Sequence, residues 1–431
     1  MAQFQPVRGT HDLLPDDYAR FRSVVDTARL AASLYGYREM ATPIFEFTDV
    51  FARSMGETSD AVSKEMYAIN DRGGENLALR PEYTAGICRA FISNGLQQHV
   101  PFKAFAWGPM FRYERPQKGR QRQFHQIDVE VIGAAEPQAD VEVISLGADI
   151  LRRLGILDKC TLQLNTLGDP ESRAAYREAL VGYFSAHKAS LSEDSLKRLE
   201  KNPLRILDSK DEGDRKLVAD APLIDNYLTQ AAGDFFSAVK QGLALAGVPF
   251  VVDPRLVRGL DYYTHTAFEF VTTHLGAQGA VIAGGRYDGL IQQLGGQPTP
   301  GIGWAGGIER LVLLSNPQPL TIETIALIPI GAAAEAEAVK IAAQLRNANF
   351  AVELAYKGNV GKRMKRADKL GCVAAFIFGD DELRNGKFKI RLMNGGGETE
   401  FNLSKLNDLS VVNREELRIA AGLAIINRSA I

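Results

Sequence analysis

The sequence predicts an α+β domain built on an antiparallel sheet, followed by a smaller α/β domain. The chain has 431 residues, more than the roughly 250–300 that a single hydrophobic core usually serves, so at least two domains are expected. Residues 103–133 alternate between apolar and polar side chains, as strands do. Beyond residue 324, strand-like and helix-like segments alternate regularly, which is typical of an α/β layer.

The first predicted domain covers residues 1–320. Apolar residues recur at helical spacing over residues 17–35, and Gly36 ends that pattern. Pro43 then opens an extended segment, and the strands of residues 103–133 follow.

A charged block with few strand-forming residues occupies about residues 169–241. Strand-like alternation resumes at Phe250–Val252 and at Thr264–Val271. The block is therefore predicted to be a helical insertion within the first domain.

The second predicted domain covers residues 324–431, after a linker at Pro317–Thr321 that contains two prolines. Its expected elements are strands at 325–330, 350–354 and 373–378, helices at 335–347 and 360–370, and a hairpin from 387–392 to 398–403.

Composition and charge exclude several classes of protein. Lys plus Arg is 50 against 52 for Asp plus Glu, so a globally basic coat protein is excluded and RNA would have to be bound by local patches. The three cysteines are far apart and no His-Glu-x-x-His motif is present, so no metal-ligating set is predicted. The sequence has neither the apolar core of a signal peptide nor an apolar run near the ~18 residues of a membrane helix. We expect a cytoplasmic protein without membrane or DNA partners.

A cationic loop between two predicted strands, within residues 111–130, is the most informative stretch of the chain. The loop carries Arg115, Lys118, Arg120 and Arg122. Such a loop suits an anionic ligand, because the guanidinium group matches phosphate in shape and charge. The alternative is an ordinary charged hairpin tip on a solvated sheet.

Polar residues also alternate along the two flanking strands. Period two places Arg112 and Glu114 on one face of the first strand, and Gln126, Asp128 and Glu130 on one face of the second. A suitable hairpin register would gather these groups on one polar floor.

A glycine-rich stretch, Gly301–Gly306, matches the pattern Gly-x-Gly-x-x-Gly. A loop precedes it rather than a buried strand, which argues against a dinucleotide-binding fold. We expect a tight glycine turn near a nucleotide, followed by a short helix over Ile308–Leu314 with Arg310 in its first turn, where the helix dipole also favours phosphate.

With these segments in place, the sequence resembles the class II aminoacyl-tRNA synthetases over essentially its whole length. Phe111-Arg112-x-Glu114, with Arg120-x-x-x-Phe124 after the loop, is similar to motif 2 of that class. Gly303–Arg310 resembles motif 3, and Gly36–Pro43 resembles motif 1, which forms dimer contacts in the class. The resemblance implies a class II catalytic domain and an anticodon-binding domain.

Two further peptides, Leu256–Tyr263 and Gly284–Leu290, are similar to ones peculiar to the histidyl-tRNA synthetase family. Leu79–Thr84 and Arg115–Arg120 fit that family as well. The family resemblance is therefore more specific than the class motifs alone.

The chain departs from the family pattern at three positions. Trp304 and Gly306 stand where the family usually has Phe and Met, and Asp128 stands where it often has a small residue. These departures concern the geometry of the pocket and not the reaction.

The resemblance implies that L-histidine reacts with ATP to give histidyl-adenylate and pyrophosphate, and that the histidyl group then passes to the 3′ end of tRNA(His). It implies two catalytic residues at the α-phosphate, Arg112 and Arg258, and Mg²⁺ on the triphosphate. The remaining implied ATP-binding residues are Glu114 on the adenine amino group, Phe124 and Arg310 on either side of the ring, and Arg120 with Arg310 on the γ-phosphate.

The implied histidine-binding residues come from several segments: Glu82, Tyr83, Thr84, Gln126, Glu130, Tyr262, Tyr263 and Tyr287. Glu82, Thr84 and Gln126 would bind the α-amino group, and Glu130 and Tyr263 would bind the imidazole nitrogens. Judged without the resemblance, the two adjacent tyrosines would be half-buried sheet aromatics.

The implied tRNA contacts fall in both domains. Arg115, Lys118 and Arg122 of the loop would approach the acceptor end. The others lie in one helical stretch of the second domain: Lys362, Arg363, Lys365 and Arg366. A solvated helix face is the alternative interpretation of that stretch.

Two other functions stay open at this point. The regulatory subunit of ATP phosphoribosyltransferase would bind histidine without charging RNA, but such proteins lack the second domain. Another class II synthetase, for proline, threonine or glycine, would lack the Arg258–Tyr263 peptide. The family resemblance also implies a homodimer.

Overall fold

The computed structural model describes residues 4–56, 59, 61–117, 119–260, 262–276, 279–317, 322–407 and 411–423. The chain divides into two compact units, Met1–Pro319 and Leu320–Ile431. Lys118 and most of the expected linker lie outside the described residues. None of the helices in the described ranges is long and apolar enough to cross a membrane.

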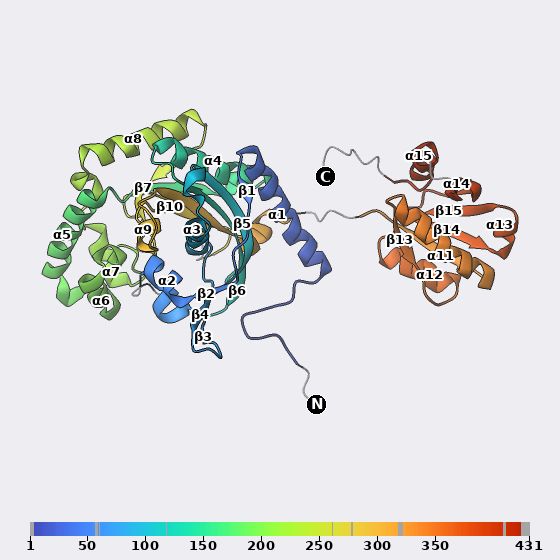
Figure 1. The fold of residues 1–431 in the computed structure, drawn as a ribbon, viewed down its shortest axis with the longest axis horizontal. Helices are drawn as coiled ribbons and strands as arrows, with labels where there is room; N and C mark the ends of the chain where they lie inside the picture. The colour runs from blue at the N-terminus through green and yellow to red at the C-terminus, as the bar shows by residue number, and fades with distance from the viewer. Residues whose placement is uncertain are drawn as a thin grey trace. The chain divides into compact units, whose positions relative to one another are not determined.

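The first unit contains short and long strands (Figure 1). They are β1 (Arg38–Glu39), β2 (Phe45–Phe47), β3 (Ala68–Asn70), β4 (Asn76–Leu79), β5 (Phe102–Phe111), β6 (Gln123–Ile132), β7 (Thr161–Thr166), β8 (Val251–Val252), β9 (Thr264–Val271), β10 (Ala280–Arg286) and β11 (Gly301–Gly307).

The α-helices of this unit are α1 (Pro15–Leu34), α2 (Thr48–Met55), α3 (Thr84–Ser93), α4 (Pro137–Arg153), α5 (Pro170–Ala186), α6 (Glu193–Lys201), α7 (Glu212–Ala219), α8 (Gln230–Leu245), α9 (Leu290–Gln293) and α10 (Ile308–Ser315). Shorter turns of helix are η1 (Ala61–Glu65), η2 (Leu96–His99), η3 (Leu157–Lys159), η4 (Lys188–Ser190), η5 (Pro203–Ile206) and η6 (Ile224–Tyr227). Helices α5 to α8 occupy the stretch between β7 and β8 where the sequence predicts helices, and Figure 1 shows them in green at one end of the unit.

The main sheet has the strand order β1-β5-β6-β11-β10-β9-β7-β8. Its neighbours pair antiparallel from β5 through to β7, and only the edge pairs β1/β5 and β7/β8 are parallel. Strands β2, β4 and β3 form a separate small sheet. The predicted antiparallel α+β fold is therefore confirmed.

The two faces of the main sheet differ in what covers them. Odd-numbered residues of β6, such as Ile127 and Val129, pack with α1, α4 and α8 in one apolar core. The other face contacts α3, α5 and α9 through small residues such as Ala104 and Ala106 of β5. Because side chains alternate along a strand, Gln126, Asp128 and Glu130 share this second face.

The glycine-rich stretch was predicted as a tight turn, and this prediction is wrong. Residues Gly301–Gly307 form β11, a central strand paired with both β6 and β10. A Cβ at Gly303 would overlap the Glu130 carboxylate and the Val129 carbonyl oxygen. Glycine is needed here because its strand neighbours approach closely, not because the backbone turns. The short helix that follows, α10, is present as predicted.

The prediction for the first hairpin strand is wrong in one respect. Strand β5 ends at Phe111, so Arg112 and Glu114 lie in the connecting loop and not on a shared strand face. The Arg112 amide donates to the Arg122 carbonyl, which draws the two sides of that loop together.

The second unit has a five-stranded sheet of order β13-β12-β14-β15-β16, with parallel pairing in its first three strands and antiparallel pairing beyond. Its strands are β12 (Thr324–Ile330), β13 (Ala351–Leu354), β14 (Ala374–Gly379), β15 (Lys387–Leu392) and β16 (Glu398–Asn402). Its helices are α11 (Ala332–Asn347), α12 (Val360–Lys369), α13 (Asp380–Arg384), α14 (Ser404–Asn407) and α15 (Val411–Ala420). This confirms the α/β layer and its terminal hairpin.

Candidate active site

A cavity of about 390 Å³ opens on the second face of the main sheet. Its walls come from the loop between β5 and β6, from β6 and β9 to β11, and from the first turns of α3 and α10. The turn η5 of the helical stretch adds Arg205 to the lining. Segments far apart in the sequence thus meet at one concavity, and ligand sites are usually concave.

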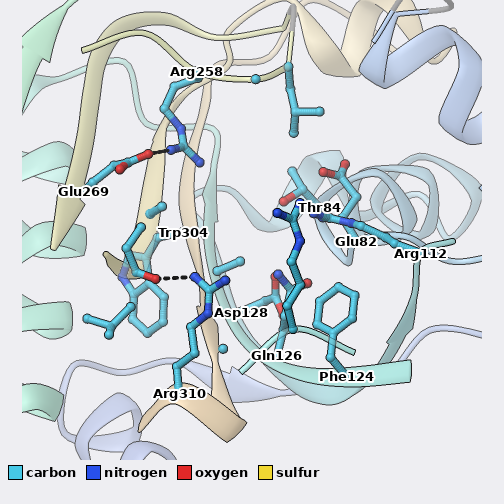
Figure 2. Close-up of a pocket in the computed structure, with 18 of the residues that line it drawn as sticks. Glu82, Thr84, Arg112, Phe124, Gln126, Asp128, Arg258, Glu269, Trp304 and Arg310 are labelled. Carbon is cyan, nitrogen blue, oxygen red and sulfur yellow. Dashed lines mark hydrogen bonds and ion pairs between the residues drawn. The ribbon is translucent and has the colours of Figure 1, made fainter. Parts of the chain in front are cut away.

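Besides Arg205, four arginines from three separate segments line this cavity, namely Arg112, Arg120, Arg258 and Arg310. Figure 2 shows Arg112, Arg258 and Arg310 extending toward the same space from different sides. Their convergence places several guanidinium groups around one partly buried space, and guanidinium groups suit the phosphates of a polyanion.

Protein contacts fix the orientation of the Arg112 and Arg258 guanidinium groups. Arg112 donates from Nε to the Pro81 carbonyl at 2.9 Å and lies 5.3 Å from the centre of the Phe124 ring. Arg258 forms an ion pair with Glu269. These contacts hold the cations in place before any ligand arrives, so little reorganisation is needed.

Arg310 is held by backbone oxygens on two sides of the cavity. It donates from Nε to the Gly119 carbonyl at 3.2 Å and from Nη1 to the Ala280 carbonyl at 2.5 Å. Helix α10 starts at Ile308, so Arg310 lies in its first turn as the sequence predicts. The contact to Gly119 also ties the cationic loop to the sheet.

Glu114 and Arg120 of the cationic loop form an ion pair. Both line the cavity, and the Glu114 side chain is buried. Phe124, at the start of β6, lines the same region. The residues predicted to bind ATP are therefore all brought to one cavity.

A group of acceptor oxygens lies on the floor of the cavity. Glu82, Gln126 and Asp128 line it, and each has a buried oxygen without a hydrogen-bond partner among the described residues. Burial raises the pKa of Glu82. Burial, with the neighbouring carboxylates of Glu130 and Glu82, raises the pKa of Asp128 well above its ordinary value. The unpartnered oxygens leave the floor open to a cationic or donor-rich group.

The two adjacent tyrosines lie in the segment before β9 and not within the sheet. The Tyr262 hydroxyl donates to Glu82 Oε2 at 3.1 Å, and its ring lies 4.5 Å from that of Tyr263. Both rings are buried and both line the cavity. The interpretation as half-buried sheet aromatics is therefore wrong for this segment.

Three residues predicted to bind histidine do not line the cavity. Glu130 is fully buried behind it and accepts hydrogen bonds from Thr84 Oγ1 and from the Tyr287 hydroxyl, each at 2.5 Å. Burial raises the pKa of Glu130 to about 8. The Tyr83 hydroxyl donates to the Trp107 carbonyl, away from the cavity lining. These residues support the lining from behind.

Other lining residues were not singled out from the sequence. Glu269 lies on β9, a strand that the sequence predicts. The alternating pattern of that strand does not indicate that Glu269 pairs with Arg258. Glu309 accepts from the His125 amide at 3.0 Å and approaches the His125 ring nitrogen at 2.8 Å. Arg205 comes from the helical stretch, where no local pattern indicates an active-site residue.

Exposed cations lie on α12 in the second unit. Lys362, Lys365 and Arg366 are exposed. Arg363 is buried, donating to the Pro329 carbonyl and pairing with Glu335. Its guanidinium joins α12 to the rest of the unit, so we do not include Arg363 in an RNA-binding face.

The loop cations predicted to contact tRNA also differ in their surroundings. Arg115 is exposed, whereas the Arg122 guanidinium lies 3.8 Å from the Tyr113 ring centre and donates from Nε to the Glu114 carbonyl. The Arg122 amide donates to the Gly9 carbonyl, so the N-terminal segment packs against this loop.

Comparison with known proteins identifies the family. Residues 9–311 match the family model described as "Histidyl-tRNA synthetase", and residues 324–411 match "Anticodon binding domain". A protein of Rhodospirillum rubrum named "Histidine--tRNA ligase" is 58% identical over 95% of this chain and 99% of its own length. One of the same name from Gluconacetobacter diazotrophicus is 56% identical over 94% of this chain and 97% of its own.

Solved structures agree with these sequence matches. The structure of apo S. aureus histidyl-tRNA synthetase has a TM-score of 0.81 and 34% identity, covering 94% of this chain and 99% of that one. The histidyl-tRNA synthetase of Nostoc has a TM-score of 0.67 at 21% identity, which shows the shared fold. The chain therefore belongs to the histidyl-tRNA synthetase family of class II aminoacyl-tRNA synthetases and carries the family's anticodon-binding domain.

Proposed function

We propose that this chain is a histidine–tRNA ligase whose cavity joins L-histidine to AMP and then passes the histidyl group to tRNA(His). The observation that carries this proposal is the convergence of four arginines and a set of carboxylate and amide oxygens in one cavity. The arginines suit a triphosphate, and the acceptor oxygens suit an ammonium group.

The first reaction is attack of the histidine carboxylate on the α-phosphorus of ATP. Two anions must approach each other, so fixed positive charge and orientation are the main requirements for catalysis. We assign Arg112 and Arg258 to the α-phosphate, where they would stabilise the charge that develops as pyrophosphate leaves. Neither role needs a nucleophilic side chain.

The rest of ATP would be held by the other residues of the cavity. Arg120 and Arg310 would bind the γ-phosphate, and Glu114 would accept from the adenine amino group. The adenine ring would lie between Phe124 and Arg310. The Glu114–Arg120 ion pair supports this arrangement, because it places the adenine-reading carboxylate next to a phosphate-binding cation.

Mg²⁺ is proposed to accompany the triphosphate. Glu269 and Glu309 line the cavity, and Mg²⁺ usually takes one or two carboxylates together with phosphate oxygens. When bound, the ion would neutralise part of the phosphate charge.

Selection of histidine is proposed to depend on hydrogen bonding to the imidazole ring. Tyr263 lines the cavity and is the direct candidate for that contact. Glu130 would act from behind, by fixing the hydroxyl groups of Thr84 and Tyr287. A buried polar site that is left unpaired by an apolar amino acid can discriminate by roughly 10⁴-fold, without an editing domain.

The tRNA would contact both units. Exposed Lys362, Lys365 and Arg366 on α12 would bind phosphates, and Arg115, Lys118 and Arg122 of the cationic loop would approach the acceptor end. A cytoplasmic location stays a prediction from the sequence.

A homodimer is also proposed. The segment resembling motif 1 leads into Ile44, Phe45 and Phe47, three exposed apolar residues at and beside the edge strand β2. Exposed apolar groups gathered at a sheet edge favour association with another chain. Sedimentation equilibrium of the wild type and of Phe45→Asp/Phe47→Asp tests this, because a dimer that uses this edge should dissociate in the variant.

The decisive experiment for the function is ATP–pyrophosphate exchange with each amino acid in turn. Exchange that depends on histidine alone supports the proposal. Exchange with proline, threonine or glycine would instead indicate another class II enzyme, and none with any amino acid would indicate a histidine-binding regulator. The anticodon-binding match at residues 324–411 already disfavours the regulator.

A further inference from the structure

Asp128 is a fully buried carboxylate whose two oxygens both lack a hydrogen-bond partner among the described residues. It lies on β6, in the row between Ala106 of β5 and Ala305 of β11, and it lines the cavity. Its strand neighbours are small and offer no donor from their side chains. Figure 2 shows Asp128 on the cavity floor with Gln126.

The nearby cations are engaged elsewhere. Arg80 donates to the carbonyls of Pro109 and Thr42, and its guanidinium lies 4.1 Å from the centre of the Tyr83 ring. Arg112 donates from Nε to the Pro81 carbonyl. In the described part of the molecule neither arginine forms an ion pair with Asp128, so a structural salt bridge does not account for this carboxylate.

The orphaned oxygens around Asp128 form a set. Glu82 keeps Oε1 without a partner while Oε2 accepts from Tyr262, and Gln126 Oε1 is also without one. With the two Asp128 oxygens, three side chains present four buried acceptors to the same cavity. A buried acceptor without a donor is costly to the folded protein, so such a cluster indicates a ligand that brings several donors.

The chemistry of the acceptors identifies the kind of donor. An ammonium group carries a positive charge and three N–H bonds, and so can satisfy three acceptor side chains at once. A neutral imidazole offers a single N–H donor, which is too few for the four unpartnered acceptor oxygens. Phosphate groups would be repelled by the two carboxylates.

We propose that Asp128 is a substrate-binding residue that binds the α-ammonium group of the amino-acid substrate, together with Glu82 and Gln126. The inference rests on the proposed function and extends it, because the histidine-binding residues expected from the family resemblance do not include Asp128. With the ammonium group held at the floor of β6, the substrate carboxylate is left to face Arg112 and Arg258.

The test compares two ligands that share the imidazole ring and the carboxylate but differ in the amino group. L-Histidine carries the ammonium, and 3-(imidazol-4-yl)propionate lacks it. Dissociation constants of both are measured by calorimetry for the wild type and for Asp128→Asn, which keeps the shape and removes the charge. Asp234→Asn, on the exposed part of α8, serves as a matched control.

Asp128→Asn should raise the dissociation constant of L-histidine by about 10- to 100-fold, the usual effect of losing a hydrogen bond to a charged group. The dissociation constant of the propionate should change by less than about 2-fold, and that of ATP should not change. Equal losses of affinity for both ligands would overturn the proposal and indicate that Asp128 contacts the imidazole ring. Unchanged L-histidine binding would overturn it outright.

Two further measurements keep the outcomes separate. Thermal unfolding should show the variant at least as stable as the wild type, because a buried unpartnered carboxylate is removed. If Asp128→Asn does not fold, Asp128→Ala is used with the same two ligands. Wild-type protein without histidine-dependent exchange would contradict the proposed function, whereas an active wild type with an unaffected variant would contradict only the role of Asp128.

Discussion

The Tyr287 hydroxyl, on the segment after β10, donates to Glu130 Oε2 on β6 across 157 residues of sequence. Thr84 at the start of α3 donates to the other carboxylate oxygen. One buried carboxylate therefore links three segments behind the cavity. Its titration and its effect on the stability of the fold can both be measured.

Replacing Glu130 with Gln should flatten the pH dependence of stability. Burial raises the pKa of Glu130 to about 8, above the ordinary value, so the folded state favours the protonated form. Its contribution to stability is full below about pH 4.5 and is lost as pH rises through about 8. The wild type should therefore lose more unfolding free energy than Glu130→Gln over this range, at up to about 1.4 kcal/mol per pH unit.

Urea unfolding at several pH values, followed by tryptophan fluorescence, measures this difference. Trp107 and Trp304 both lie in the first unit, so the signal reports that unit. Because the pKa values of Glu82 and Asp128 are also raised, the unfolding free energy of the variant should still fall somewhat as pH rises. Parallel pH curves for the two proteins would contradict the prediction, and Glu171→Gln on the exposed part of α5 is the control.

Gly303→Ala should destabilise the first unit by about 3 kcal/mol or more, because a Cβ there overlaps the Glu130 carboxylate and the Val129 carbonyl in a tightly packed sheet. Gly182→Ala is the matched control, since its Cβ would meet nothing within 4 Å on helix α5. That control should be neutral or more stable by up to about 1 kcal/mol. Denaturant midpoints decide the matter, and equal midpoints for both variants would refute the packing argument.

Arg258→Ala should reduce ATP–pyrophosphate exchange by about 10²-fold or more, the usual effect of removing one fixed donor from a site of developing charge. The fold should be kept, because the main partner of the side chain is Glu269 at the cavity edge. Arg53→Ala, which removes an exposed arginine on α2, is the control. Near-normal exchange in Arg258→Ala would remove the residue from the proposed mechanism.

Lys362→Ala/Lys365→Ala should weaken tRNA charging several-fold without changing exchange, because these exposed cations lie in the anticodon-binding unit. The logarithm of tRNA affinity should also fall less steeply with the logarithm of salt, by about 0.7–0.9 for each lost phosphate contact. Lys340→Ala on α11 is an exposed control. Equal losses in charging and exchange would indicate a structural effect instead.

Local periodicity explains what could be predicted from the sequence. The alternation of Gln126, Asp128 and Glu130 is a property of one strand, so their shared face follows without knowledge of the rest of the fold. Which of them reaches the cavity depends on Thr84 and Tyr287, which come from distant segments. No short-range pattern contains that information.

Two wrong expectations have a similar cause. The glycines of Gly301–Gly307 have a local preference for turns, but pairing on both sides makes them a strand. Arg363 was grouped with its basic neighbours, although Arg363 and Ala367 are one helical turn apart and both face inward. That four-residue spacing was a signal in the sequence, and it would have separated Arg363 from the exposed cations.

The composition of β11 has a consequence for efforts to change the amino acid that the cavity accepts. This strand presents Gly301, Gly303, Ala305 and Gly307 on the side of Asp128, so its wall is mostly backbone. A wall made of main chain cannot be reshaped by point substitution without disturbing the sheet. Libraries aimed at unnatural amino acids should therefore vary β6 and α3 and leave β11 unchanged.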